Sequence, residues 1–147
     1  MSDLRFIDTN VLLYSISREK AESAKREAAI ALLERDDCAL SVQVLQEFYV
    51  QATRPSRTHP LPHALAVGLV ETWLRFPVAE TTISTVAAAF KIKADHGLSY
   101  WDSAIVAAAK ALGCRELYTE DLSGGRTIEG IAIVNPFRPR RSLGRQR

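Results

Sequence analysis

The sequence has few cysteines and no long hydrophobic run. Its two cysteines, Cys38 and Cys114, have no second cysteine or histidine nearby at the spacing of zinc ligands, so we expect two buried free thiols. No apolar stretch approaches the ~20 residues that cross a bilayer, and the opening Met-Ser-Asp lacks the basic and apolar regions of a signal peptide. We therefore expect a cytoplasmic protein without a membrane partner.

Glycine-rich nucleotide-binding motifs are also missing, since the sequence contains neither GxxxxGK[ST] nor GxGxxG. The 147 residues are 47% hydrophobic and 24% charged, which is typical of one globular domain. The net charge is +2, but five arginines fall within the last ten residues, so residues 1–137 carry a net charge of −3. We expect one domain over 1–137 and a basic tail over 138–147, which either contacts phosphate groups or is merely solvated.

Short apolar stretches alternate with segments of helical spacing. Strands are predicted at 4–7, 38–40, 77–80, 116–119 and 131–134. The second helix is expected from about 18 to 35, with Ser17 as its cap and its alanines facing the core. This alternation predicts an α/β domain with a central parallel five-stranded sheet and right-handed crossovers.

Asp8, Thr9 and Asn10 follow the first predicted strand directly. In open α/β sheets, ligands bind outside the carboxyl ends of the strands, so Asp8 is placed for chemistry. Alternatively, any of the three side chains can cap the helix that starts near Val11, because their oxygens accept hydrogen bonds from free backbone N–H groups. The triplet by itself leaves both interpretations open.

Three further acids have ordinary explanations when each is taken alone. Asp121 follows the fourth strand, as Asp8 follows the first. Asp102 stands three residues after Ser99, the spacing of a capping box, and an acid in a first helical turn also gains from the helix dipole. Glu47 lies off the apolar stripe of its helix, which is typical of a solvated carboxylate.

Together, the four acids require a different explanation. Carboxylates within ~4 Å of one another would repel by several kcal/mol at an effective dielectric of ~20, so a cluster needs protonation or a divalent cation. Oxygen ligands without cysteine or histidine favour Mg²⁺ or Mn²⁺ over zinc. Such ions support phosphoryl chemistry by activating water and neutralising the scissile phosphate.

Four sequence segments also resemble one known family. These are FIDTN at 6–10, the glutamate within QVLQEFYV at 43–50, YWDSAIVAAA at 100–109 and LYTEDL at 117–122. They resemble the PIN domain, and the short chain is similar to the VapC toxin ribonucleases. The similarity spans residues 4–137 in the order and spacing of the family.

The resemblance implies both a fold and a site. Its strand order, 3-2-1-4-5, would set the first and fourth strands side by side, with Asp8 and Asp121 facing one crevice. The catalytic and metal-binding positions would be Asp8, Glu47, Asp102 and Asp121. The side chains that support them would be Thr9, Asn10, Ser103, Thr119 and Glu120.

The expected function is therefore a Mg²⁺- or Mn²⁺-dependent endoribonuclease that acts on structured RNA. By resemblance, its products carry a 5′-phosphate and a 3′-hydroxyl, the active form is a homodimer, and a cognate antitoxin blocks the site. Arg54 and Arg57, in a loop of low helical propensity, are candidate RNA contacts. The alternatives are a PIN-fold module that binds RNA or a partner without cutting, and a phosphate-accepting receiver or nucleotide-binding module, which the missing glycine-rich motifs disfavour.

Overall fold

The computed structural model describes residues 3–122 and 125–138 and contains one central sheet. Its strands are β1 (Arg5–Ile7), β2 (Cys38–Ser41), β3 (Val78–Ala79), β4 (Glu116–Tyr118), β5 (Thr127–Ile128) and β6 (Ile131–Val134). They are ordered β3-β2-β1-β4-β6-β5. The first five of these positions reproduce the expected order 3-2-1-4-5, with all pairs parallel.

One strand was not expected from the sequence. β5 is the edge strand and pairs antiparallel with β6, with Thr127 opposite Ala132 and Ile128 opposite Ile131. The two strands are joined by a tight turn in which Glu129 and Gly130 both have positive φ angles. The predicted α/β fold is thus confirmed, and it carries a short hairpin at one edge of the parallel sheet.

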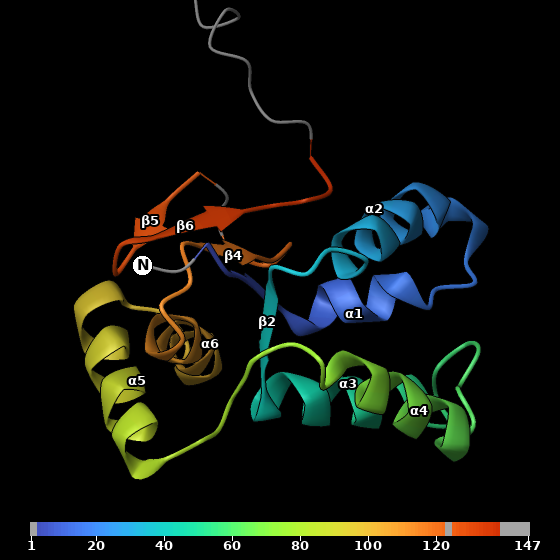
Figure 1. Ribbon diagram of the computed structural model, residues 1–147, viewed down its shortest axis with the longest axis horizontal. Coiled ribbons are helices and arrows are strands. Elements are labelled where there is room, and N and C mark those ends of the chain that lie inside the picture. Colours follow the sequence, from blue (N-terminus) through green and yellow to red (C-terminus); the bar gives the residue numbers. More distant parts are fainter. Residues whose placement is uncertain (1–2, 123–124, 139–147) are drawn as a thin grey trace, which may run out of the picture.

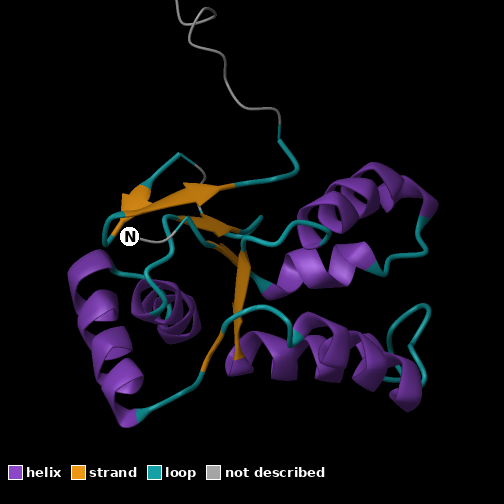
Figure 2. Ribbon diagram, in the orientation of Figure 1, coloured by secondary structure: helices purple, strands orange, loops and turns teal. Residues whose placement is uncertain are grey.

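Helices cover both sides of the sheet (Figure 1, Figure 2). They are α1 (Thr9–Ser15), α2 (Ser23–Leu33), α3 (Val42–Thr53), α4 (His63–Trp73), α5 (Ile83–His96) and α6 (Tyr100–Ala111), with a single 3₁₀ turn, η1 (Lys20–Glu22), before α2. Figure 1 shows α5 and α6 on one side and α1 to α4 on the other. The side chains of Phe6, Leu40 and Leu117 are fully buried between these layers.

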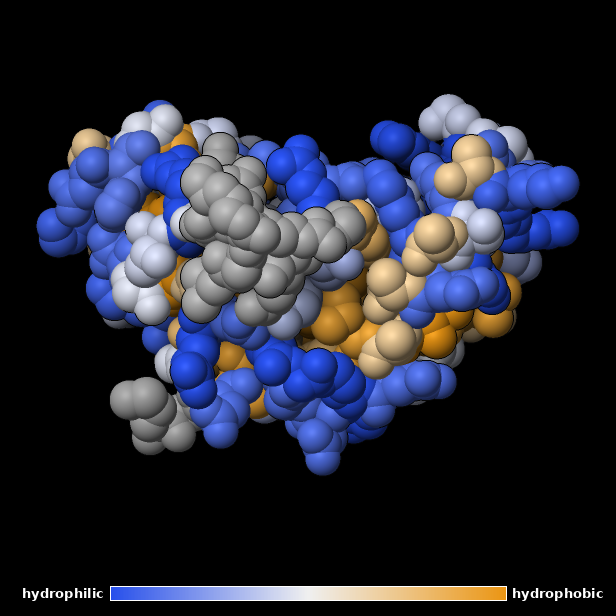
Figure 3. All heavy atoms as spheres, turned by 90° about the horizontal axis from the view of Figure 1, so that it is seen from above, coloured by the Kyte–Doolittle hydropathy of each residue, from blue (hydrophilic) through white to orange (hydrophobic). Residues whose placement is uncertain are grey.

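The second helix begins later than its pattern predicts. Ser17 does not cap it: the Ser17 hydroxyl accepts a hydrogen bond from the N–H of Glu19 and donates one to Glu22, which holds the turn before η1. Only Ala29 and Leu33 of α2 are buried. The other apolar residues of α2 remain at least partly exposed. Figure 1 places α1 and α2 on the right of the molecule, and Figure 3 shows apolar surface in its right half.

The described part of the chain ends at Arg138. The proposed basic tail, residues 138–147, lies outside the described residues except for Arg138. Just before it, the ring of Phe137 packs edge-on against Tyr14 at a centroid distance of 4.8 Å. Within the described ranges, no helix combines the length and apolar character needed to cross a bilayer.

Candidate metal-binding and nuclease site

Asp8 lies at the carboxyl end of β1, in the middle of the sheet. β1 runs between β2 and β4, and the N–H of Asp8 still donates to the carbonyl of Tyr118 on β4 at 3.1 Å. The Asp8 carboxylate accepts the N–H of Thr9 at 2.7 Å and the hydroxyl of Thr119 at 2.8 Å. Asp8 is also the N-cap residue of α1, so the two interpretations of its position are compatible.

Glu47 is held by contacts to α1 and within α3. Its Oε1 accepts the hydroxyl of Thr9 at 2.7 Å, and its Oε2 accepts the side-chain amide of Gln43 at 3.3 Å. Gln43, Glu47 and Gln51 are spaced four residues apart, so they share one face of α3. That face flanks the buried stripe of Val44 and Phe48, and it borders the N-terminus of α1 rather than open solvent.

Asp121 follows β4 and is held by Asn10. The Asn10 amide donates to Asp121 Oδ2 at 3.1 Å and to the hydroxyl of Thr119 at 3.3 Å. The N–H of Asp121 donates to the same Thr119 hydroxyl at 3.1 Å. Because Thr119 also donates to Asp8, one hydroxyl connects the acids that follow β1 and β4.

Asp102 enters the site from the first turn of α6. Ser99 caps this helix by accepting the backbone N–H of Asp102 at 3.1 Å, so the cap uses the main chain of Asp102. The neighbouring Ser103 is fully buried and donates its hydroxyl to the carbonyl of Ser99 at 2.8 Å. Ser103 therefore supports the start of α6 and is not among the residues that line the cavity described below.

The four acids line one cavity of about 260 Å³. Its other walls are Thr9, Asn10, Leu13, Gln43, Gln51, Trp101 and Ile105. Glu120 does not belong to this lining, since its carboxylate points to Tyr14 and Lys25. Sequence reasoning missed Gln43 and Gln51, although their four-residue spacing from Glu47 was a visible signal.

The pKa of Asp8 is strongly shifted by its surroundings. Burial raises the pKa of Asp8 to about 6, against hydrogen bonds from Thr119 and from the N–H of Thr9 that lower it. The negative charges of Asp121 and Glu47 raise the Asp8 pKa further. A raised acid pKa inside a cavity lined by other acids is typical of a functional site, because a bound cation would restore the ionised form.

The lining of the cavity, if it binds Mg²⁺ or Mn²⁺, would suit a hydrated ion. Among residues 3–122 and 125–138, no three His, Cys, Asp or Glu side chains are arranged to hold a metal ion directly. Mg²⁺ usually keeps several of its waters and takes only one or two carboxylates from the protein. Four carboxylates and no soft ligand around a cavity of this size match that chemistry.

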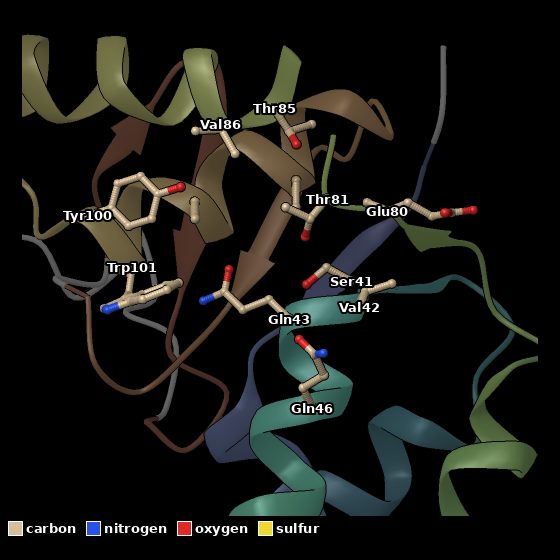
Figure 4. A pocket seen from close by; sticks show the side chains of 13 residues that line it. Ser41, Val42, Gln43, Gln46, Glu80, Thr81, Thr85, Val86, Tyr100 and Trp101 are labelled. Atoms are coloured by element: carbon tan, nitrogen blue, oxygen red, sulfur yellow. The ribbon is translucent and has the colours of Figure 1, made fainter. Parts of the chain in front are cut away.

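A second cavity, of about 270 Å³, adjoins the acidic one (Figure 4). Gln43 and Trp101 line both cavities, and Figure 4 shows the Gln43 amide extending toward Trp101. The other walls shown there include Ser41, Gln46 and Thr81. Trp101 is 64% exposed although its ring packs edge-on against Tyr100, so a large aromatic surface faces solvent beside the acids.

The two arginines expected to contact RNA occupy the connection from α3 to α4. Arg54 is exposed and follows the end of α3, three residues after Gln51 of the acidic cavity. Arg57 is half-buried and lines a different cavity, of about 170 Å³, together with Arg18 and His59. Arg54 therefore lies nearer to the acids along the chain, and Arg57 faces the loop before α2.

This arrangement defines a doubly wound α/β domain with an acidic cavity at the carboxyl ends of its central strands. The family model described as the PIN domain matches residues 5–123. The chain belongs to the PIN domain family. No curated protein matches it by sequence.

Several solved structures share this fold. A toxin–antitoxin complex from Klebsiella pneumoniae has 19% identity and a TM-score of 0.67, over 90% of this chain and 97% of that one. VapC20 of Mycobacterium tuberculosis, a toxin that cleaves the sarcin–ricin loop, has 18% identity and a TM-score of 0.62, over 80% of this chain and 91% of that one. DNA-bound VapBC from Salmonella typhimurium has 21% identity and a TM-score of 0.61, over 90% of this chain and 97% of that one.

Proposed function

We propose that this protein is a metal-dependent endoribonuclease and the toxin of a toxin–antitoxin pair. The observation that supports this function is the cavity into which four separate segments each bring one acid: Asp8, Glu47, Asp102 and Asp121. Membership of the PIN domain family supports nuclease chemistry, and the structural neighbours include VapC20 and VapBC. The proposed cofactor is Mg²⁺ or Mn²⁺.

The four acids would hold the ion, in part through water. When bound, such an ion supplies a nucleophilic water and offsets the charge of the scissile phosphate. The Asp8 carboxylate is oriented by Thr9 and Thr119, and Glu47 by Thr9 and Gln43, so two acids are fixed before an ion binds. Because these two carboxylates are already fixed, binding an ion costs less side-chain rotational entropy than it would with freely rotating carboxylates.

Cleavage of a structured RNA by purified protein tests this function. We expect cleavage with Mg²⁺ or Mn²⁺, its loss in excess EDTA, and products with a 5′-phosphate and a 3′-hydroxyl. Asp8→Asn, Glu47→Gln, Asp102→Asn and Asp121→Asn should each abolish cleavage, and combinations should cost no more than single changes, because the acids act as a unit. Circular dichroism serves as the control for folding.

Three outcomes would contradict parts of this proposal. Cleavage that continues unchanged in EDTA would exclude the metal mechanism. RNA binding without cleavage under any divalent ion would favour the non-cleaving binding module. A variant Asp102→Asn that cuts normally but melts earlier would assign Asp102 to the start of α6 alone.

We further propose that the active form is a homodimer. α5 exposes two large apolar side chains seven residues apart on one face, with Ile83 87% and Phe90 60% accessible. Exposed apolar surface of this kind is typical of an interaction site. Ultracentrifugation should give a dimer for the wild type and a monomer for Ile83→Glu combined with Phe90→Glu, and a wild-type monomer at micromolar concentration would contradict the proposal.

The proposed antitoxin inhibits by placing an arginine among the four acids. Converging carboxylates create a negative potential, and a guanidinium forms bidentate, charge-assisted hydrogen bonds with them. Inhibition should therefore weaken when Mg²⁺ is raised and when that single antitoxin arginine is changed to alanine. If no arginine matters and Mg²⁺ has no effect, the antitoxin blocks the RNA path instead.

A further inference from the structure

Lys25 reaches from α2 to the loop that carries Asp121. Its ammonium group forms an ion pair with Glu120, the residue immediately before Asp121, and donates to the hydroxyl of Tyr14 at 3.2 Å. The same Tyr14 hydroxyl donates to Glu120 Oε1 at 2.6 Å. The three side chains therefore form a closed triangle between α1, α2 and the loop after β4.

Two aromatic rings lie beside the Lys25 ammonium. The Lys25 ammonium lies 4.8 Å from the centroid of Tyr14 and 5.8 Å from that of Phe137. Cation–π contacts of this geometry favour the charged ammonium.

From Glu120 the contacts continue to the acids. The backbone N–H of Glu120 donates to Asn10 Oδ1 at 3.3 Å, and the Asn10 amide donates to Asp121 and Thr119. The loop after β4 is therefore held at the main chain by Asn10 and at the side chain of Glu120 by Lys25. Asp121 itself is exposed, so its position depends on these two attachments together with the hydrogen bond from its own N–H to the Thr119 hydroxyl.

We propose that Lys25 is a positioning residue, which keeps Asp121 directed into the acidic cavity by fixing Glu120. This inference rests on the proposed metal-dependent function. It gives α2, which contributes no residue to the cavity lining, control over one of the four acids. An exposed ion pair without such a connection would affect neither metal binding nor turnover.

The test compares two lysines that each pair with an acid. In Lys25→Met the apolar stem stays and the charge is lost. Lys91→Met is the matched control, because Lys91 pairs with Asp95 on the exposed face of α5 at 2.8 Å. Mn²⁺ binding to the purified protein, followed by electron paramagnetic resonance, is measured together with kcat, KM and the melting temperature.

We expect Lys25→Met to weaken Mn²⁺ binding by roughly 10-fold, the lower end for residues that orient metal ligands. We expect kcat to fall while KM and the melting temperature change little, and Lys91→Met to match the wild type. Glu120→Gln should resemble Lys25→Met. The exchanged pair Lys25→Glu with Glu120→Lys should recover part of the lost Mn²⁺ affinity.

Two results would overturn the inference, and only the second would also contradict the proposed function. If Lys25→Met binds Mn²⁺ as the wild type does, the triangle is a structural ion pair only, and the proposed function stands. If the wild type binds Mn²⁺ no better than Asp8→Asn, the acidic cavity is not a metal site, and both proposals fail.

Discussion

Asp8 should lower the stability of the metal-free protein at neutral pH. Burial raises its pKa to about 6, whereas an aspartate in an unfolded chain titrates near ~3.9. The folded protein therefore binds more protons between these two values, and stability falls as the pH rises through that window. The loss of stability levels off about one pH unit above the folded-state pKa, where Asp8 is almost fully ionised.

The variant Asp8→Asn tests this directly. At pH 7.5 without divalent ions we expect the variant to melt about 5 °C above the wild type, because its free energy of unfolding rises by on the order of 2 kcal/mol. The difference should shrink toward pH 4. Asp36→Asn, at an exposed position, is the control and should shift nothing. Lower melting of Asp8→Asn at every pH would mean that the lost hydrogen bonds from Thr9 and Thr119 cost more than removal of the buried charge gains.

The two cysteines should be unreactive in the folded protein. Both are free and buried, as expected, and burial raises the pKa of each thiol to about 12. Because the thiolate is the nucleophile, almost none is present at pH 8. A thiol-reactive dye should label two sites per chain in denaturant and none within minutes in buffer. Rapid labelling of the native protein would show that one site opens locally.

Glu129 connects three elements at one edge of the domain. It lies in the turn between β5 and β6, and its carboxylate accepts Lys110 of α6 at 2.7 Å and contacts His96 of α5 at 2.8 Å. The hydrogen bond from Lys110, followed by that from His96, lowers the pKa of Glu129 to about 2. This contribution to stability is present above the ordinary glutamate pKa and is lost as the pH falls toward 2.

We therefore expect Glu129→Gln to lower the melting temperature at pH 7 and to match the wild type near pH 2. The expected fall is about 2–4 °C, because Lys110 is largely exposed and such pairs contribute up to ~1 kcal/mol. Thermal melts at pH 7, 4 and 2 measure it, with Asp95→Asn as the control for an exposed pair. An equal difference at every pH would point to packing rather than charge.

Sequence periodicity was sufficient for the parallel strands and most helices, but not for contacts between elements. β5 was missed because two residues, Thr127 and Ile128, carry no periodic signal and pair only through β6. The helical wheel classed Glu47 as solvated because a wheel contains no information about the α1 residue Thr9 that binds it. The ion pair of Lys25 with Glu120 joins residues 95 positions apart, beyond any local pattern.

At the scale of the whole molecule, the charge is divided between an acidic cavity and a basic end. Arg138, the last described residue, already acts on Glu120, since its positive charge contributes to lowering the pKa of that acid. The other four arginines of the last ten residues follow it in the sequence. We propose that this tail contacts phosphate groups of the RNA on which the cavity acts.

Deleting residues 138–147 should weaken RNA binding and flatten its dependence on salt. Each lost phosphate contact should reduce the log–log slope by ~0.7, as for single strands. Binding measured between 50 and 300 mM KCl gives this slope, and a tail of equal length with glutamine at the five arginine positions separates charge from chain length. An unchanged slope would mean that the tail is merely solvated.

The placement of the two tryptophans gives the protein an intrinsic optical signal at its acidic cavity. Trp73 is 4% exposed and packs edge-on against Phe48, whereas Trp101 is 64% exposed at the rim. The red edge of the emission band should therefore arise mainly from Trp101, and acrylamide should quench that component first. RNA bound over the acids would cover this indole, so binding can be followed by fluorescence without an attached dye.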